Sequence, residues 1–110
     1  MLTQARPREA MTLTVLVVDD QSLTLTLTAR MLRTLGYAVL TTDAPLSAID
    51  LARGGARIDC VLTDLTMPGM SGQELARRLR KICPDGRTIH LDKPLSKSAL
   101  DDAVREAIGD

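Results

Sequence analysis

The sequence predicts an α/β fold, in which a doubly wound parallel sheet of about four strands is covered on both faces by about four helices. Two observations predict it. Short apolar runs alternate four times with longer segments of helical periodicity. The apolar runs are continuous, as is typical of strands buried on both faces of a parallel sheet. With 110 residues, 45% of them hydrophobic, the chain is long enough for one domain with a core and too short for two.

The first strand and the first helix come from adjacent segments. The run TVLVV at 14–18 predicts a strand that stops at Asp19 and Asp20. LTLTLT at 23–28 follows, and its period of two would by itself indicate another strand. Apolar residues nevertheless continue at helical spacing, at Leu23, Leu27, Met31 and Leu35. We therefore predict a helix, and Gly36 is its stop.

The second strand–helix pair and the third strand follow the same pattern. YAVLTT at 37–42 predicts a strand, and Pro45 then opens a helix that Gly54 and Gly55 end. Three apolar residues share one face of this helix: Leu46, Ile49 and Ala52. IDCVLT at 58–63 predicts the third strand.

The third helix begins after a turn that contains Pro68 and Gly69. Ser71 and Glu74 have the spacing of a capping box at its start. Its apolar stripe consists of Leu75, Leu79 and Ile82. We expect its cations to form a solvated outer face: Arg77, Arg78, Arg80 and Lys81.

The last strand and helix complete the pattern. RTIHL at 87–91 predicts the fourth strand, and Ser96 can cap a final helix. The apolar residues of that helix lie on one side: Leu100, Val104 and Ile108. Residues 1–11 have no periodicity, so we expect a flexible tail there and a single domain over 12–110.

Composition and charge exclude several classes of function. Fourteen Lys and Arg residues balance fourteen Asp and Glu residues, so no net field attracts nucleic acid or an anionic membrane. One tyrosine and no Phe or Trp leave no stacking platform for single-stranded nucleic acid. No apolar segment approaches the roughly 20 residues that span a bilayer. Cys60 and Cys83 lack metal-ligand spacing, so we expect reduced structural thiols in a soluble, cytoplasmic protein.

Charged residues follow three of the predicted strands: Asp19 and Asp20, Asp64, and Lys93. In open parallel sheets, chemistry gathers outside the carboxyl ends of the strands. If the first and third strands are neighbours, the three carboxylates converge and repel each other unless a cation is present. Mg²⁺ suits such a site, and an ammonium at Lys93 would complete a phosphate-sized pocket. Each residue alone fits a cap or a turn, but the combination indicates phosphoryl transfer.

Three motifs resemble the response-regulator receiver domain of two-component signalling. They are VLVVDDQ at 15–21, LTDLTMPGMSGQEL at 62–75 and LDKPLS at 91–96. The resemblance implies a flavodoxin-like fold. It also implies that Asp64 accepts a phosphoryl group from a phosphohistidine on a sensor histidine kinase or histidine phosphotransfer protein, and later loses it to water. Such a domain is a signalling phosphoprotein, and not an enzyme beyond its own phosphoryl transfer and slow autodephosphorylation.

The resemblance also implies the remaining site residues. Asp19 and Asp20 would hold Mg²⁺, directly or through water, and the metal would also meet the Asp64 carboxylate and the backbone carbonyl of Thr66. Lys93 would pair with the phosphoryl oxygens.

Two further positions also match the family pattern. Pro94 would follow a cis Lys93–Pro94 peptide that aims the lysine inward. His90 falls where the family usually has a switching aromatic residue.

The chain departs from the family pattern between Cys83 and Thr88. Lys93 follows Asp64 by only 29 residues, whereas the family has a further strand and helix in this interval. One strand, one helix and two short loops already take roughly 25 residues, so the interval has room for only one such unit. One βα unit is therefore absent, and CPDGRT marks the place where it is missing. The absent strand normally ends in a Ser or Thr that contacts the phosphoryl group, and Thr88 begins its strand, at the wrong end.

Losing an inner strand leaves unpaired edges, which are costly when buried. We expect the last strand to pair beside the third, which gives the strand order 2-1-3-4 and moves Lys93 toward the vacated hydroxyl position. The alternative is that a second molecule supplies or exchanges a strand, which gives a homodimer or a strand-swapped oligomer.

Three functions compete at this point. The first is a minimal phosphoacceptor receiver. The second is a pseudo-receiver that binds other proteins without being phosphorylated, its switching lost with the missing unit. The third is a magnesium-dependent phosphohydrolase, which would have a second acid at the position of Thr66 and a substrate pocket that a short chain does not offer.

Overall fold

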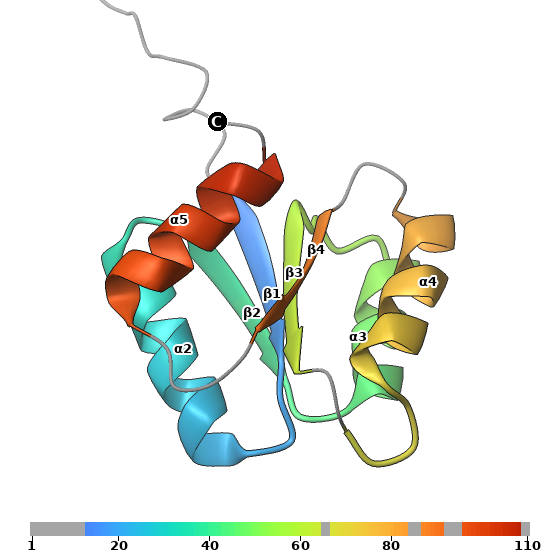
Figure 1. The fold of residues 1–110 in the computed structure, drawn as a ribbon. Coiled ribbons are helices and arrows are strands. Elements are labelled where there is room, and N and C mark those ends of the chain that lie inside the picture. Colours follow the sequence, from blue (N-terminus) through green and yellow to red (C-terminus); the bar gives the residue numbers. More distant parts are fainter. Residues whose placement is uncertain (1–12, 65–66, 84–86, 92–95, 109–110) are drawn as a thin grey trace, which may run out of the picture.

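The computed structural model describes residues 13–64, 67–83, 87–91 and 96–108 (Figure 1). Strands and helices alternate along this part of the chain, as the sequence predicts. The elements are β1 (Thr14–Val18), α2 (Ser22–Thr34), β2 (Ala38–Thr42), α3 (Pro45–Arg53), β3 (Cys60–Asp64), α4 (Gly72–Ile82), β4 (Arg87–Leu91) and α5 (Lys97–Ile108). The tail predicted at 1–11 lies outside the described residues. None of the helices described is both long and apolar enough to cross a membrane.

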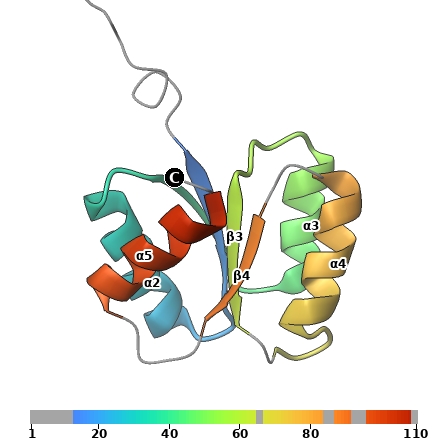
Figure 2. The same ribbon diagram turned by 45° about the horizontal axis from the view of Figure 1, so that its top comes forward.

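The four strands form one parallel sheet in the order β2-β1-β3-β4. Helices α2 and α5 cover one face of this sheet, and α3 and α4 cover the other (Figures 1 and 2). The last strand pairs directly with the third over all five of its residues, from Arg87 to Leu91. The predicted order, with four strands and the last one beside the third, is therefore confirmed.

The core has two parts, one on each face of the sheet. Leu16, Val18 and Val61 pack with α3 and α4, whereas Val15 and Val17 pack with α2 and α5. Successive residues of a strand point to opposite faces, and here both faces are covered. This explains why the strands are continuous apolar runs instead of alternating ones.

Helix α2 forms as predicted, but none of the four apolar residues of the predicted stripe is fully buried. Its fully buried residues are Thr28, Ala29 and Leu32. Leu23 and Leu27 are 72% and 46% exposed, and both lie in the first half of the helix. The stripe shows that the segment is helical, but the packing of α2 against β1, β2 and α5 decides which face is buried.

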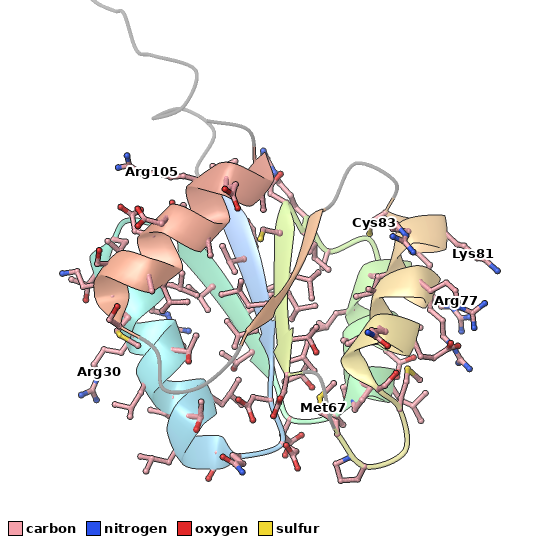
Figure 3. All side chains as sticks on the ribbon, in the orientation of Figure 1. Arg30, Met67, Arg77, Lys81, Cys83 and Arg105 are labelled. Atoms are coloured by element: carbon pink, nitrogen blue, oxygen red, sulfur yellow. The ribbon has the colours of Figure 1, made fainter. Side chains whose placement is uncertain are left out.

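Two helices begin with the serine caps that the sequence predicts. The Ser71 hydroxyl oxygen accepts a hydrogen bond of 3.1 Å from the Glu74 N–H, and that of Ser96 accepts one of 3.1 Å from the Ala99 N–H. The Glu74 carboxylate instead pairs with Arg77 and Arg78. Of the predicted capping box, the serine contact therefore forms, and the glutamate side chain binds the two arginines. The cations of α4 are exposed, as expected, and Arg77 and Lys81 point away from the sheet (Figure 3).

Candidate functional site

Carboxylates from two neighbouring strands meet at one end of the sheet, the lower end in Figure 1. Asp19 and Asp20 follow β1, and Asp64 is the last residue of β3. Because β1 pairs with β3, with Val18 opposite Thr63, the chain reaches Asp19 beside Asp64. One carboxylate oxygen from each of the three aspartates lies within 4.8 Å of the others. The predicted convergence is confirmed.

The three aspartates differ in their access to solvent. Asp19 is only 6% exposed, and its Oδ1 accepts a hydrogen bond of 2.9 Å from the N–H of Gln21. Its own N–H donates to the Thr42 carbonyl at 3.2 Å, so its backbone is tied to β2. Asp64 is half-buried and Asp20 is exposed. The cluster thus has a fixed, buried side and an open side that a ligand can reach.

The backbone of Asp64 is packed tightly. The Thr63 hydroxyl donates a hydrogen bond of 3.1 Å to the Asp64 carbonyl oxygen. The first residue of α4, Gly72, lies so close that a Cβ atom there would collide with the same oxygen. It would also lie 3.2 Å from the Asp64 carbonyl carbon and 3.2 Å from Thr63 Cγ2. Only glycine fits at position 72 without displacing this backbone.

Sequence reasoning did not single out Thr63 or Gly72. The one signal was a glycine at the first position of a helix already capped by Ser71, where glycine has no capping role. The turn before α4 agrees with its sequence, since Gly69 has a φ of 85°, a value that favours glycine. Met67 is buried in the core next to α4.

The other predicted site residues are not placed by the structure. His90 lies on β4 opposite Thr63 in the register, and only its backbone is described. Thr66, Lys93 and Pro94 lie outside the described residues. Their roles stay predictions.

The donor set fits a hard divalent cation. Carboxylate oxygens are the ligands that Mg²⁺ prefers, and it commonly uses one or two of them together with water and phosphate oxygens. Carboxylates within 4.8 Å of one another also repel, and a bound cation relieves this repulsion. Asp19, Asp20 and Asp64 are therefore suited to a magnesium site.

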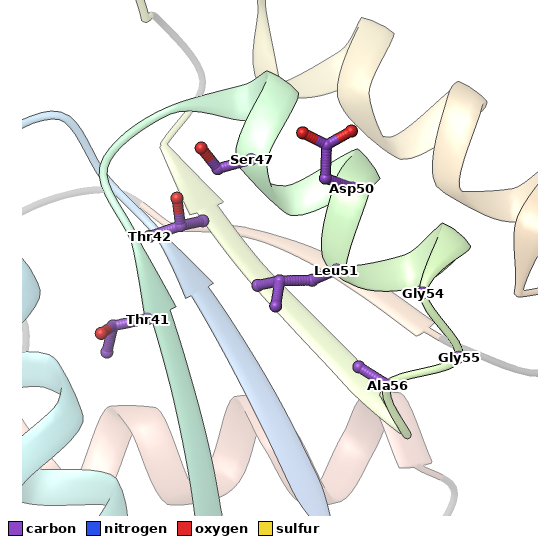
Figure 4. A pocket seen from close by; sticks show the side chains of 8 residues that line it. All are labelled: Thr41, Thr42, Ser47, Asp50, Leu51, Gly54, Gly55 and Ala56. Atoms are coloured by element: carbon purple, nitrogen blue, oxygen red, sulfur yellow. The ribbon is translucent and has the colours of Figure 1, made fainter.

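An open pocket lies beside the edge strand β2 (Figure 4). Its volume is about 660 Å³, and it lies between β2, α3 and the turn after α3. Its polar lining includes Thr41, Ser47 and Asp50, but no second carboxylate. None of the three clustered aspartates lines it, so this pocket is separate from the candidate magnesium site.

The comparison with protein families decides the identity of the domain. The model of the response regulator receiver domain matches residues 15–105. The chain belongs to this family. Receiver domains are signalling modules of two-component systems that hold Mg²⁺ at an acidic site, and the aspartate cluster of this chain matches that description.

Curated relatives of this receiver domain are much longer proteins. The virulence sensor protein BvgS of Bordetella pertussis is 45% identical over 78 residues, which cover 71% of this chain and 6% of BvgS. The cyclic di-GMP phosphodiesterase response regulator RpfG of Xanthomonas campestris is 34% identical over 101 residues, covering 84% of this chain and 26% of RpfG. The chain thus spans only a small part of the length of these relatives.

Solved structures confirm the flavodoxin-like receiver fold. The receiver domain from the hybrid histidine kinase CckA superposes with a TM-score of 0.80 at 25% identity, covering 86% of this chain and 98% of that one. A receiver domain protein from Clostridium thermocellum gives a TM-score of 0.81 at 27% identity, covering 88% and 94%. The receiver fold thus persists although β4 lies directly beside β3.

Proposed function

We propose that this receiver domain takes a phosphoryl group onto Asp64 from a phosphohistidine of a sensor histidine kinase or histidine phosphotransfer protein. One observation carries the proposal: Asp64 is half-buried at the end of β3, with the Asp19 and Asp20 carboxylates within 4.8 Å of its own. A nucleophilic carboxylate beside a cation-binding pair is what an aspartyl phosphate requires.

The residues of the cluster have different proposed roles in cation binding. Asp19 and Asp20 would hold Mg²⁺ together with the Asp64 carboxylate and the Thr66 carbonyl. When bound, the cation offsets the negative charge of the phosphoryl oxygens. Asp19 is buried, and the Gln21 N–H fixes its carboxylate, so it would hold the cation from one side. Asp20 is exposed, and its carboxylate can turn toward the ligand.

The chemical step needs one nucleophile. An Asp64 oxygen attacks the phosphorus atom, the P–N bond to the histidine breaks, and the imidazole nitrogen takes the electron pair. In the later hydrolysis a water oxygen attacks the phosphorus, the P–O bond to Asp64 breaks, and inorganic phosphate leaves while the carboxylate is regenerated. We propose that the Lys93 ammonium pairs with the phosphoryl oxygens in both steps, aimed inward by a cis peptide before Pro94.

Exposed leucines beside the cluster support a protein donor. Gln21, whose N–H binds Asp19, is the N-cap of α2, and Leu23 and Leu27 lie on its first two turns. A phosphohistidine must reach Asp64 at this end of the sheet, so its protein must lie close to α2. Exposed leucines supply apolar contact area to such a partner. We propose that both leucines contact the donor protein.

The oligomeric state is a separate proposal. Within one chain β4 already pairs with β3 along its whole length, so a second copy is not needed to complete the sheet. In the part of the chain that is described, β4 is nevertheless an edge strand, and this supports a homodimer formed at that edge. Size-exclusion chromatography with light scattering distinguishes a monomer from a homodimer or a strand-swapped oligomer.

Intact-mass spectrometry with acetyl phosphate tests the phosphoacceptor function. The protein should gain one phosphoryl adduct in the presence of Mg²⁺, and much less in its absence. Asp64→Asn should remove the adduct and keep the circular dichroism spectrum, whereas Asp43→Asn, on an exposed turn, should label like the parent. No adduct on the folded parent would support a pseudo-receiver, an interpretation that the assembled cluster does not favour.

A further inference from the structure

Thr63 and Gly72 both contact the Asp64 carbonyl group. We propose that they are positioning residues, which hold the Asp64 backbone so that its carboxylate meets Asp19 and Asp20. The inference rests on the proposed function, because it assigns the phosphoryl chemistry to Asp64. It concerns two residues that do not themselves touch the phosphoryl group.

The contact with Gly72 is steric. Gly72 opens α4, and its Cα faces the Asp64 carbonyl so closely that any Cβ would overlap the oxygen. The clash is with backbone atoms of the sheet, which cannot rotate away as a long side chain can. Alanine at position 72 must therefore move either the start of α4 or the end of β3.

The contact with Thr63 is a hydrogen bond. Thr63 is 1% exposed, and its hydroxyl donates to the Asp64 carbonyl at 3.1 Å. Its Cγ2 lies on the side of Gly72, where an added Cβ would be 3.2 Å away. The Thr63 side chain is thus held between β3 and α4, and it fixes the carbonyl that Gly72 covers. The two contacts restrict the same peptide group.

The carbonyl orientation matters because the carbonyl carbon and the side chain of Asp64 are attached to the same Cα. If the clash is relieved by moving the end of β3, the Asp64 Cα moves, and the carboxylate moves with it. The cluster is compact, with its oxygens within 4.8 Å, so a small shift changes the geometry of both cation binding and nucleophilic attack. A misplacement of about 1 Å can lower a reaction rate by about 100-fold.

The steric part is tested with Gly72→Ala beside Gly54→Ala. Gly54 ends α3 with a φ of −75°, and a Cβ there would lie 3.3 Å from the Asp50 carbonyl oxygen, away from the cluster. On samples shown to be folded by circular dichroism, the initial rate of acetyl phosphate labelling is measured at saturating Mg²⁺. We expect Gly72→Ala to lose at least 10-fold in rate and Gly54→Ala less than twofold. A Gly72→Ala rate within twofold of the parent would overturn the inference.

The hydrogen-bond part keeps the inference testable if Gly72→Ala does not fold. Thr63→Val removes the hydroxyl and preserves the shape of the side chain, whereas Thr63→Ser keeps the hydroxyl. We expect Thr63→Val to label several-fold more slowly, and Thr63→Ser to label faster than Thr63→Val although it has lost a buried methyl group. Equal rates for the parent and Thr63→Val would contradict the inference. If Thr63 acts only through packing, Thr63→Val should label faster than Thr63→Ser, because valine keeps the buried methyl group that serine lacks.

Mg²⁺ affinity separates this inference from the proposed function. If the parent takes no phosphoryl group, the phosphoacceptor function fails, but the cation site can still be titrated by calorimetry with Mg²⁺ alone. Weaker Mg²⁺ binding by folded Gly72→Ala or Thr63→Val than by Gly54→Ala would then support the positioning role. Unchanged affinity in both variants would overturn it.

Discussion

Asp64 and Leu91, the last residues of β3 and β4, lie opposite each other in the parallel register. The chain therefore leaves β4 directly beside the proposed phosphoacceptor, with no strand between them. Lys93 follows Leu91 by two residues, which span at most about 7 Å. This short chain length supports the proposed contact between Lys93 and the phosphoryl oxygens.

This register predicts that Lys93 is needed for phosphorylation. Lys93→Met should lower the rate of labelling by acetyl phosphate by about 100-fold, because a group that stabilises developing negative charge is lost. Lys97→Met, which removes the same charge from an exposed site on the first turn of α5, serves as the control and should stay within about twofold. Similar rates for Lys93→Met and Lys97→Met would exclude the lysine from the site. Intact-mass time courses give both rates.

The exposed leucines of α2 predict a defect confined largely to protein donors. Leu23→Glu should lower the rate of transfer from a phosphorylated histidine phosphotransfer protein by about 10-fold or more, since interface anchors often cost over 1 kcal/mol when removed. Labelling by acetyl phosphate, which needs no protein contact, should fall much less.

The matched control is Leu46→Glu. Leu46 is 65% exposed on α3, on the opposite face of the sheet, so it carries the same change without lying on α2. If Leu46→Glu slows protein-to-protein transfer as much as Leu23→Glu, then α2 is not the contact surface. Phosphotransfer followed on Phos-tag gels measures both variants.

Much of the fold could be predicted from the sequence, because strands that are buried on both faces of the sheet are continuous apolar runs. The limits of β1 at 14–18 and β4 at 87–91 are confirmed. The sequence predicts the third strand at 58–63, but the strand begins two residues later, at Cys60. Asp59 instead turns its carboxylate to the start of β1, where it accepts a hydrogen bond of 2.8 Å from the Thr14 N–H. Such a long-range side-chain contact cannot be predicted from the local pattern of apolar residues, so the predicted start of β3 is too early.

Part of the candidate site could also be predicted from the sequence, and part could not. The meeting of Asp19 and Asp64 could be predicted, because the carboxyl ends of neighbouring parallel strands share one edge of the sheet. The contact of Gly72 with the Asp64 carbonyl could not, since it depends on how closely α4 approaches the end of β3. Nor could the exposure of Leu23, because a leucine at helical spacing does not reveal which face of the helix is covered.

The buried thiol of Cys60 should be inert in the folded protein. Burial, with a smaller effect of the Asp59 carboxylate, raises the pKa of Cys60 to about 12, and the side chain is 0% exposed. Since the thiolate is the reactive form, DTNB should modify Cys60 only after unfolding in guanidinium chloride. Cys83→Ser isolates Cys60 for this assay. Rapid modification of native Cys83→Ser would show that the strand β3 opens readily.

Tyr37 predicts a loss of stability at alkaline pH. Burial raises the pKa of Tyr37, the nearby Asp101 carboxylate raises it further, and Arg105 opposes them. The Tyr37 hydroxyl lies 3.5 Å from Asp101 Oδ1 and can donate a hydrogen bond only while protonated. Because the folded-state pKa is raised, its contribution is fully present below the unfolded value of about 10 and is lost as pH rises through the folded pKa. The urea midpoint should therefore fall above about pH 10, more steeply in the parent than in Tyr37→Phe.

The titration itself can be observed directly, because Tyr37 is the one tyrosine in the chain and Trp is absent. Absorbance at 295 nm then reports the tyrosinate of a single residue. Asp101→Asn should lower the folded-state pKa of Tyr37 toward about 10, since it removes a negative charge that opposes ionisation. Asp102→Asn removes an equal charge from an exposed neighbouring position of α5 and should shift the midpoint less. Equal shifts in the two variants would show that Tyr37 senses the overall charge of α5 and not its contact with Asp101.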